Sequence, residues 1–240
     1  MQPNQDLHSS TAPGVSEGNR LAEELTEADG ETIKISGDRR ALDKMMGTAL
    51  SDASIGHLFG GIKESLIEIE PDGSNVDVWT TNDRFETPLY YSVERDESGI
   101  IQTINDFFLK DSAPKTLGTR MVAHMIFEAA RIPRFDSIRA SATRIYYPKD
   151  GGSIREVNGY YFFPRLGFNA DPKNADDYLE IPKALKGKKL LSIMQDPQTR
   201  QWWKENGQTI EVRFKIRSKR SILALQTYLL ERGINISNAA

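Results

Sequence analysis

The sequence contains no cysteine. A disulfide framework, a thiolate zinc site, an iron–sulfur cluster and catalysis through an acyl-cysteine are therefore excluded. Long hydrophobic runs are missing as well, because the longest apolar stretches, such as Ile222 to Leu225, are far too short to span a bilayer. We therefore expect no membrane-spanning segment and no membrane partner.

A strong charge of either sign is also absent, since 31 basic and 34 acidic residues give a formal net charge of -3. Such a balance does not favour nucleic acid or anionic lipid as a partner, and any anion site must be local. Met1 to Gly14 lacks the basic start and apolar run of a secretory signal. We expect a cytoplasmic protein.

The 240 residues, of which 38% are hydrophobic, suffice for one large domain or for one domain with an extension. Residues 1–30 are polar with few apolar side chains, and we interpret them as a disordered tail with room for one short helix. Residues 31–171 form the expected domain. Residues 172–240 form a carboxy-terminal extension that packs on it.

Strand and helix patterns alternate along the domain. Thr32 to Ile35 predicts a strand, and Arg39 to Lys63 predicts two short helices interrupted by glycines. Four further strand segments are separated by turn residues and indicate an antiparallel meander. They are Ser65 to Glu70, Val76 to Thr80, Leu89 to Glu94 and Ile100 to Leu109.

The pattern then changes to a helix, Leu117 to Arg131, which ends before Pro133. The later elements are a strand at Ser137 to Arg144, a loop with Asp150-Gly151-Gly152, an aromatic segment at Asn158 to Phe168, a polar connector beyond Asp171, a strand at Ile210 to Ile216 and a helix at Ser221 to Arg232. The fold class is α/β, a mixed and largely antiparallel sheet flanked by helices, with a carboxy-terminal strand and helix.

One stretch has the pattern of an anion site. A long strand, a loop with Lys115 and a helix beginning Leu117-Gly118-Thr119-Arg120 follow one another. A helix start offers free amide N–H groups, and a glycine there lets a phosphate come close to the backbone. Ordinary packing is the commoner explanation of such a single glycine, and both the Walker pattern and Gly-x-Gly-x-x-Gly are absent.

The order of these elements, which ends in Leu166-Gly167-Phe168, resembles the GCN5-related N-acetyltransferase superfamily over roughly Thr32 to Phe168. The resemblance implies transfer of an acetyl group from acetyl-coenzyme A, a cosubstrate, to an amine acceptor that the sequence does not identify. Gly118 matches the last glycine of the family's pyrophosphate loop. Ala113 and Thr116 stand where the family has Gln or Arg and an earlier glycine.

By this resemblance the coenzyme is expected at eight residues: Phe108, Leu109, Lys115, Leu117, Gly118, Thr119, Arg120 and Asn158. Backbone amides near Leu109 would orient the pantetheine and polarise the thioester carbonyl. Asn158 matches a coenzyme-contacting asparagine of the family.

The catalytic residues of the family are matched less completely than its coenzyme-binding residues. Phe163 occupies the position of the tyrosine that often protonates the leaving thiolate, so Tyr160 or Tyr161 would supply the hydroxyl, unless both belong to an aromatic core. Asp106 is a candidate base, as is Glu94, and each can equally be a surface or turn residue. These substitutions keep a catalytically silent binding module of the same fold open as an alternative.

Two further features have plain structural interpretations. His124 has no second ligand at metal spacing, so we expect a helix-surface residue and no metal site. Basic residues interleaved with Trp202 and Trp203 suit a nucleic-acid surface. However, the alternation of Val212, Phe214 and Ile216 with Arg213, Lys215 and Arg217 is typical of a half-buried edge strand, with the tryptophans as packing anchors.

Overall fold

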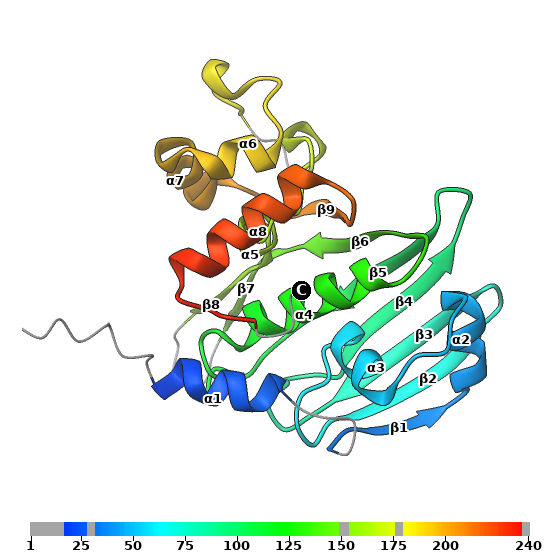
Figure 1. The fold of residues 1–240 in the computed structure, drawn as a ribbon. Coiled ribbons are helices and arrows are strands. Elements are labelled where there is room, and N and C mark those ends of the chain that lie inside the picture. The colour runs from blue at the N-terminus through cyan, green and yellow to red at the C-terminus, as the bar shows by residue number, and fades with distance from the viewer. Residues whose placement is uncertain (1–16, 28–31, 149–153, 176–179, 237–240) are drawn as a thin grey trace, which may run out of the picture.

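The computed structural model describes residues 17–27, 32–148, 154–175 and 180–236 (Figure 1). Its strands are β1 (Lys34–Gly37), β2 (Leu66–Asp72), β3 (Asn75–Thr81), β4 (Leu89–Arg95), β5 (Ile100–Asp106), β6 (Phe135–Ala142), β7 (Arg144–Pro148), β8 (Ile154–Asn158) and β9 (Ile210–Lys215). Its α-helices are α1 (Glu17–Thr26), α2 (Arg39–Met46), α3 (Asp52–Leu58), α4 (Leu117–Arg131), α5 (Gly159–Arg165), α6 (Leu190–Gln195), α7 (Pro197–Asn206) and α8 (Lys219–Glu231).

Seven strands form one sheet in the order β1-β2-β3-β4-β5-β6-β9. The meander β2 to β5 is antiparallel, β9 pairs antiparallel with β6, and two pairs, β1 with β2 and β5 with β6, are parallel. The predicted α/β class with a mixed, largely antiparallel sheet flanked by helices is confirmed. The sequence did not reveal the second sheet, a hairpin of β7 and β8.

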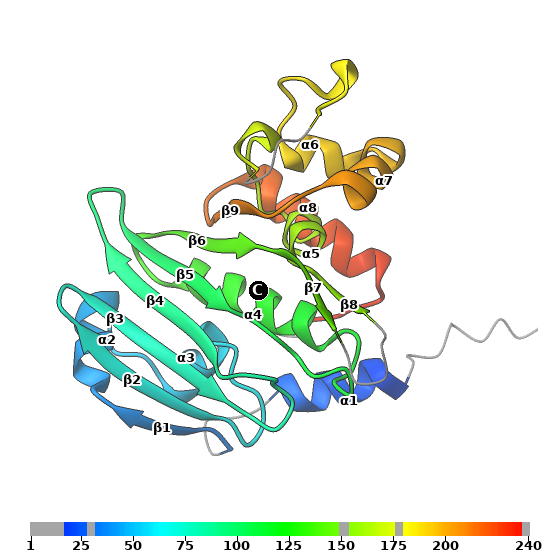
Figure 2. The ribbon, with the colours of Figure 1, turned by 180° about the vertical axis from the view of Figure 1, so that it is seen from behind.

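Helices α2, α3 and α4 cover one face of the large sheet, whereas none of the helices in the described ranges lies over β2 to β4 on the other face (Figures 1 and 2). Strand alternation produces this difference, because Val76, Val78, Tyr91 and Val93 point into the core. Their chain neighbours point to the uncovered face and are partly or fully exposed. The meander thus presents one apolar and one polar face.

Capping side chains define the two short helices predicted between Arg39 and Lys63. The Asp38 carboxylate accepts from the Ala41 amide at 3.0 Å, and the Ser51 hydroxyl accepts from the Ser54 amide at 3.1 Å. Gly37, directly before α2, has φ 85°, and a Cβ there would lie 2.0 Å from the Ile69 carbonyl oxygen. Only glycine therefore allows β1 to turn into α2 so close to β2.

Helix α4 has the predicted bounds but is buried on almost every side. Besides its apolar stripe, the polar side chains of Thr119, Arg120, His124 and Glu128 are buried. The prediction that His124 lies on the helix surface is wrong, because α1 and α3 pack against α4 and cover its polar side chains. Periodicity identifies a helix's apolar face but not what covers its polar face.

The one short helix for which the predicted tail left room is present at Glu17–Thr26, but it packs on the domain instead of belonging to a disordered segment. These residues form α1, which packs on α4 with Ala22 fully buried. The few apolar residues of this segment are enough because they lie at helical spacing against an already buried helix. Residues 1–16 and 28–30 of the predicted tail lie outside the described residues.

The carboxy-terminal residues join the same sheet. Strand β9 extends it at β6, with Val212 and Phe214 buried and Lys215 exposed, as the alternation predicts. Trp203 is fully buried and its Nε1 donates to the Tyr160 carbonyl at 2.9 Å, so it packs against α5. The predicted loop with Asp150-Gly151-Gly152 lies outside the described residues.

Candidate functional site

A gap between two parallel strands defines the candidate site. β5 and β6 are paired up to Ile104 and Ala140. Beyond this last pair, β6 continues beside β9, whereas β5 leads into a loop. At this loop the Glu86 amide donates to the Phe108 carbonyl, and the Lys110 amide donates to the Arg84 carbonyl. The two central strands therefore separate at their carboxyl ends.

A cavity of about 430 Å³ occupies this gap, within the usual size range of small-molecule sites. One wall is the end of β5 with Phe107 and Phe108, and the opposite wall holds Ser141, Thr143 and Ile145. The remaining lining comes from the end of β8, from the loop between β5 and α4, from the start of α4 and from α5. The cavity is therefore built from elements that are distant in the sequence.

The start of α4 closes one side of the cavity. Its cap residue Thr116 makes no side-chain capping hydrogen bond, and Gly118 and Thr119 line the cavity with the first turn of the helix. A Cβ at Gly118 would lie 3.2 Å from Leu109 Cδ1 and 3.4 Å from Phe107 Cε1. The glycine thus lets these two side chains pack against the helix start, where free amides and the helix dipole favour an anion.

A bulge at Asn105 places Asp106 at the mouth of the cavity. Tyr91 pairs with Ile104, but the preceding Tyr90 pairs with Asp106, so one residue of β5 has no partner on β4. Because the bulge adds a residue, Asp106 points to the same sheet face as Tyr90 instead of toward the helices. Asp106 is exposed and lines the cavity, and Lys115 contributes a positive charge to the same lining.

Helix α5 completes the site. Asn158, directly before it, is exposed and lines the cavity, and so do Phe162 and Phe163. A Cβ at Gly159 would lie 3.0 Å from the Thr143 backbone nitrogen, so this glycine lets α5 come close to the end of β6. Pro164 lies inside the helix, and α5 has only 7 residues, as expected for a segment containing a proline.

Seven of the residues predicted from the sequence therefore meet at one cavity: Asp106, Phe108, Leu109, Lys115, Gly118, Thr119 and Asn158. Leu117 is fully buried in the hydrophobic core beside them.

Arg120 lies elsewhere. Its guanidinium is buried 3.5 Å from the Glu23 carboxylate of α1 and donates to the Asn235 carbonyl at 2.9 Å. Burial lowers the pKa of this guanidinium, and the carboxylates of Glu23 and Glu27 oppose that effect. Arg120 thus joins three parts of the chain and is not among the cavity's lining residues.

The two candidate tyrosines also lie outside the cavity lining. Tyr160 is buried and its hydroxyl donates to the Lys204 carbonyl at 2.6 Å. Tyr161 is half-buried, with the Arg165 guanidinium and the Lys204 ammonium each 6.0 Å from its ring centroid. The aromatic rings that do face the cavity from α5, those of Phe162 and Phe163, have no proton to give.

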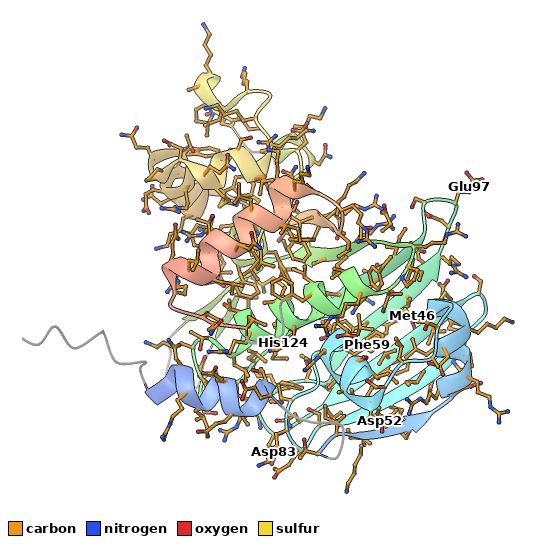
Figure 3. All side chains as sticks on the ribbon, in the orientation of Figure 1. Met46, Asp52, Phe59, Asp83, Glu97 and His124 are labelled. Atoms are coloured by element: carbon orange, nitrogen blue, oxygen red, sulfur yellow. The ribbon has the colours of Figure 1, made fainter. Side chains whose placement is uncertain are left out.

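Glu94, the second candidate base, forms an ion pair of 2.9 Å with Arg139 of β6. The histidines His57 and His124 stack with ring centroids 4.6 Å apart, at the contact of α3 with α4. Figure 3 shows His124 on α4. Burial first, and then the neighbouring His57 and Arg120, lower the pKa of His124 to about 4.

The described residues hold no group of three or more His, Asp or Glu side chains arranged to bind a metal ion. Within the same ranges, no helix has both the length and the apolar character needed to cross a membrane. Searches of protein-family models, curated proteins and solved structures found no match to this chain.

Proposed function

We propose that the cavity binds the thioester end of an acyl-coenzyme A and that the protein transfers the acetyl group to an amine. The observation that carries this proposal is the separation of β5 and β6 directly beside the uncapped start of α4. It supplies a slot for an extended chain next to a site for its phosphates. The order of elements that resembles the GCN5-related N-acetyltransferases supports the same interpretation.

The chain's own groups fit this ligand. The Phe108 carbonyl accepts from the Glu86 amide, and the Lys110 amide donates to the Arg84 carbonyl, so both point away from the cavity. Because backbone groups alternate along a strand, those of Phe107 point to the cavity, where they can bond to pantetheine amides. The Gly118 and Thr119 amides and the Lys115 ammonium would hold the pyrophosphate.

In the transfer, the amine nitrogen attacks the thioester carbonyl carbon, the carbon–sulfur bond breaks, and the sulfur leaves as a thiolate. Asp106, at the cavity mouth, is the proposed acceptor of the proton that the amine loses. The positions of Tyr160 and Tyr161 favour water as the group that protonates the thiolate, since neither lines the cavity. A thiol with a pKa of about 8.5 tolerates this route.

Thermal unfolding tests the binding step. Acetyl-coenzyme A at 100 times its Kd should stabilise the chain by about 2.7 kcal/mol, whereas ATP should not stabilise it. Dephospho-coenzyme A should stabilise the chain nearly as well, because the site proposed here holds the pyrophosphate and pantetheine. No stabilisation by acetyl-coenzyme A at millimolar concentration would contradict the proposal.

A silent binding module is the second candidate, and the lack of a tyrosine among the described residues that line the cavity favours it. A panel of amines separates the two candidates through coenzyme A release. In Phe163→Tyr a hydroxyl enters the cavity, and the release rate should rise if the protein is an enzyme. Binding of acetyl-coenzyme A without turnover in both proteins would favour the module.

A further inference from the structure

Four side chains form a row across the uncovered sheet face, from β2 to β5. Glu68 pairs in register with Trp79, Trp79 with Tyr90, and Tyr90 with Asp106. Register partners point to the same face, and strands lie about 4.8 Å apart, so this Glu68–Asp106 row is about 14 Å long. Figure 2 shows this face of the sheet without a covering helix.

The middle of the row is aromatic and its ends are acidic. The rings of Trp79 and Tyr90 stack with centroids 5.3 Å apart and an angle of 8° between their planes. Both are half-buried, while Glu68 and Asp106 are exposed. A stacked aromatic pair thus lies between two carboxylates, and one of these carboxylates lines the cavity.

Further carboxylates surround the row. Asp77 accepts a hydrogen bond from the Tyr90 hydroxyl, and Asp72 lies close enough to raise the pKa of both groups, although burial is the larger cause for each. Glu70 is exposed on the same face.

Glu94, which lies further along β4 than Tyr90, forms an ion pair with Arg139. The acids around the row differ in this respect. Over the described part of the chain, no Lys or Arg forms an ion pair with any of the five carboxylates, Glu68, Glu70, Asp72, Asp77 and Asp106. Lys34 is a cation on this face, in register with Leu66 at the sheet edge. The face therefore carries an excess of negative charge beside exposed aromatic surface.

We propose that the Glu68–Asp106 row binds the acceptor, and that the acceptor is an extended aliphatic amine with two or more ammonium groups. One terminal nitrogen would lie at Asp106 in the cavity mouth, and a distant ammonium would pair with Glu68. The chain between them would cross Trp79 and Tyr90, whose ring surfaces attract both methylene groups and ammonium groups. This inference rests on the proposed function for the role of the cavity.

Two protons leave the terminal nitrogen and one is taken up by the sulfur. The terminal ammonium first loses a proton to water, and the neutral nitrogen attacks the thioester carbonyl carbon. Asp106 accepts the second proton as the amide forms and the carbon–sulfur bond breaks, the thiolate takes up a proton from water, and Asp106 then returns its proton to water. The distant ammonium stays charged and bound.

Isothermal titration with spermine, without any coenzyme, tests the row directly. We expect saturable binding of one spermine at low ionic strength that weakens as salt is added. Glu68→Gln and Trp79→Leu should each raise the spermine Kd about threefold to tenfold. Glu68 is exposed, so its variant remains informative even if the tryptophan variant fails to fold.

Glu97→Gln is the matched control. Glu97 lies in the turn between β4 and β5, at the far end of the sheet from the Trp79–Tyr90 pair, and its variant loses the same charge (Figure 3). Its spermine Kd should equal that of the unchanged chain. Equal weakening in Glu97→Gln and Glu68→Gln would show a diffuse charge effect and would overturn the proposal.

Two further measurements separate this inference from the proposed function. Spermine binding without stabilisation by acetyl-coenzyme A would overturn the proposed function but not the cation site. Stabilisation by acetyl-coenzyme A without spermine binding would overturn the inference alone. If both bind and mass spectrometry finds acetylation of another amine of the panel but not of spermine, the row does not hold the acceptor. Sedimentation tests whether the face is free. A dimer that buries this face and does not dissociate when spermine is added would also overturn the inference.

Discussion

The Arg120 guanidinium donates a 2.9 Å hydrogen bond to the carbonyl of Asn235, which lies 115 residues further along the chain. Its side chain is 3% exposed and also lies 3.5 Å from the Glu23 carboxylate. A buried guanidinium is stable only while such partners remain, because its charge has left water. Arg120 therefore ties α1 and the carboxy-terminal segment to α4.

Removing the Glu23 carboxylate should destabilise the fold. We expect Glu23→Ala to lower the free energy of unfolding by about 1 to 2 kcal/mol, less than for a fully buried pair because Glu23 keeps contact with water. Urea denaturation measures the change. Arg20→Ala, which removes an exposed charge of the same helix, should change stability by less than about 0.5 kcal/mol. Equal effects would show that α1 does not depend on Arg120.

The buried His124 makes stability depend on pH. Its pKa is about 4 in the folded chain and about 6.5 when unfolded, so the unfolded state binds a proton first as the pH falls. Stability should therefore be full above pH 6.5 and fall by up to about 3 kcal/mol between pH 6.5 and pH 4.

Glu128 acts over a different range. A hydrogen bond with His57 is the main cause that lowers its pKa from 4.5, so its contribution is lost only as the pH falls below that value. His124→Gln should flatten the stability curve between pH 6.5 and pH 4, as measured by urea denaturation across this range. A curve as steep as that of the unchanged chain would assign the effect to other groups.

Gly118 should control coenzyme binding. Gly118→Asp adds a side chain and a negative charge where the pyrophosphate is proposed, so it should abolish thermal stabilisation by acetyl-coenzyme A. Lys115→Ala should weaken binding by about 1 to 3 kcal/mol and make it less dependent on salt. Gly118→Ala is the steric control, since its Cβ meets the movable side chains of Leu109, Phe107 and Phe162 and adds no charge. Unchanged stabilisation in Gly118→Asp would show that the coenzyme does not bind at the start of α4.

Tyr160 should matter for folding and not for transfer. Tyr160→Phe loses the hydroxyl that donates to Lys204 and should cost about 1 kcal/mol of stability. Tyr161→Phe should cost less, because its hydroxyl accepts only a long 3.4 Å contact from Arg165. Coenzyme A release rates should stay within twofold in both variants. A loss of about 100-fold in either would be the signature of a general acid and would contradict the placement described here.

Local patterns in the sequence were sufficient for most elements of the fold. The helix Leu117–Arg131 and the meander strands follow from periodicities of 3.6 and 2 residues with clear turn residues between them. These signals extend over a few residues, so they can be recognised without knowing which other segments the element packs against. The strand and helix at the carboxy-terminal end were predicted for the same reason.

The candidate site was predictable only in part. Lys115 and Gly118 could be singled out because a strand, a loop and a helix start follow one another there, and a family resemblance gave Gly118 and Asn158 a place in known motifs. Which aromatic rings face the cavity depends instead on how α5 rotates against β6, and the segment Gly159-Tyr160-Tyr161-Phe162-Phe163 is too uniformly aromatic to reveal it. The sequence therefore suggested Tyr160 and Tyr161 for the cavity, whereas in the packed helix Phe162 and Phe163 line it.

Other features depend on contacts between distant segments. The parallel pairing of β5 with β6 connects strands separated by a whole helix, and the bulge at Asn105 becomes visible only when β4 and β5 are aligned. The burial of His124 and Arg120 requires α1 and α3 to pack on a helix face that the sequence shows as polar. Burial and strand register are properties of pairs of segments, and a pattern along one segment does not contain them.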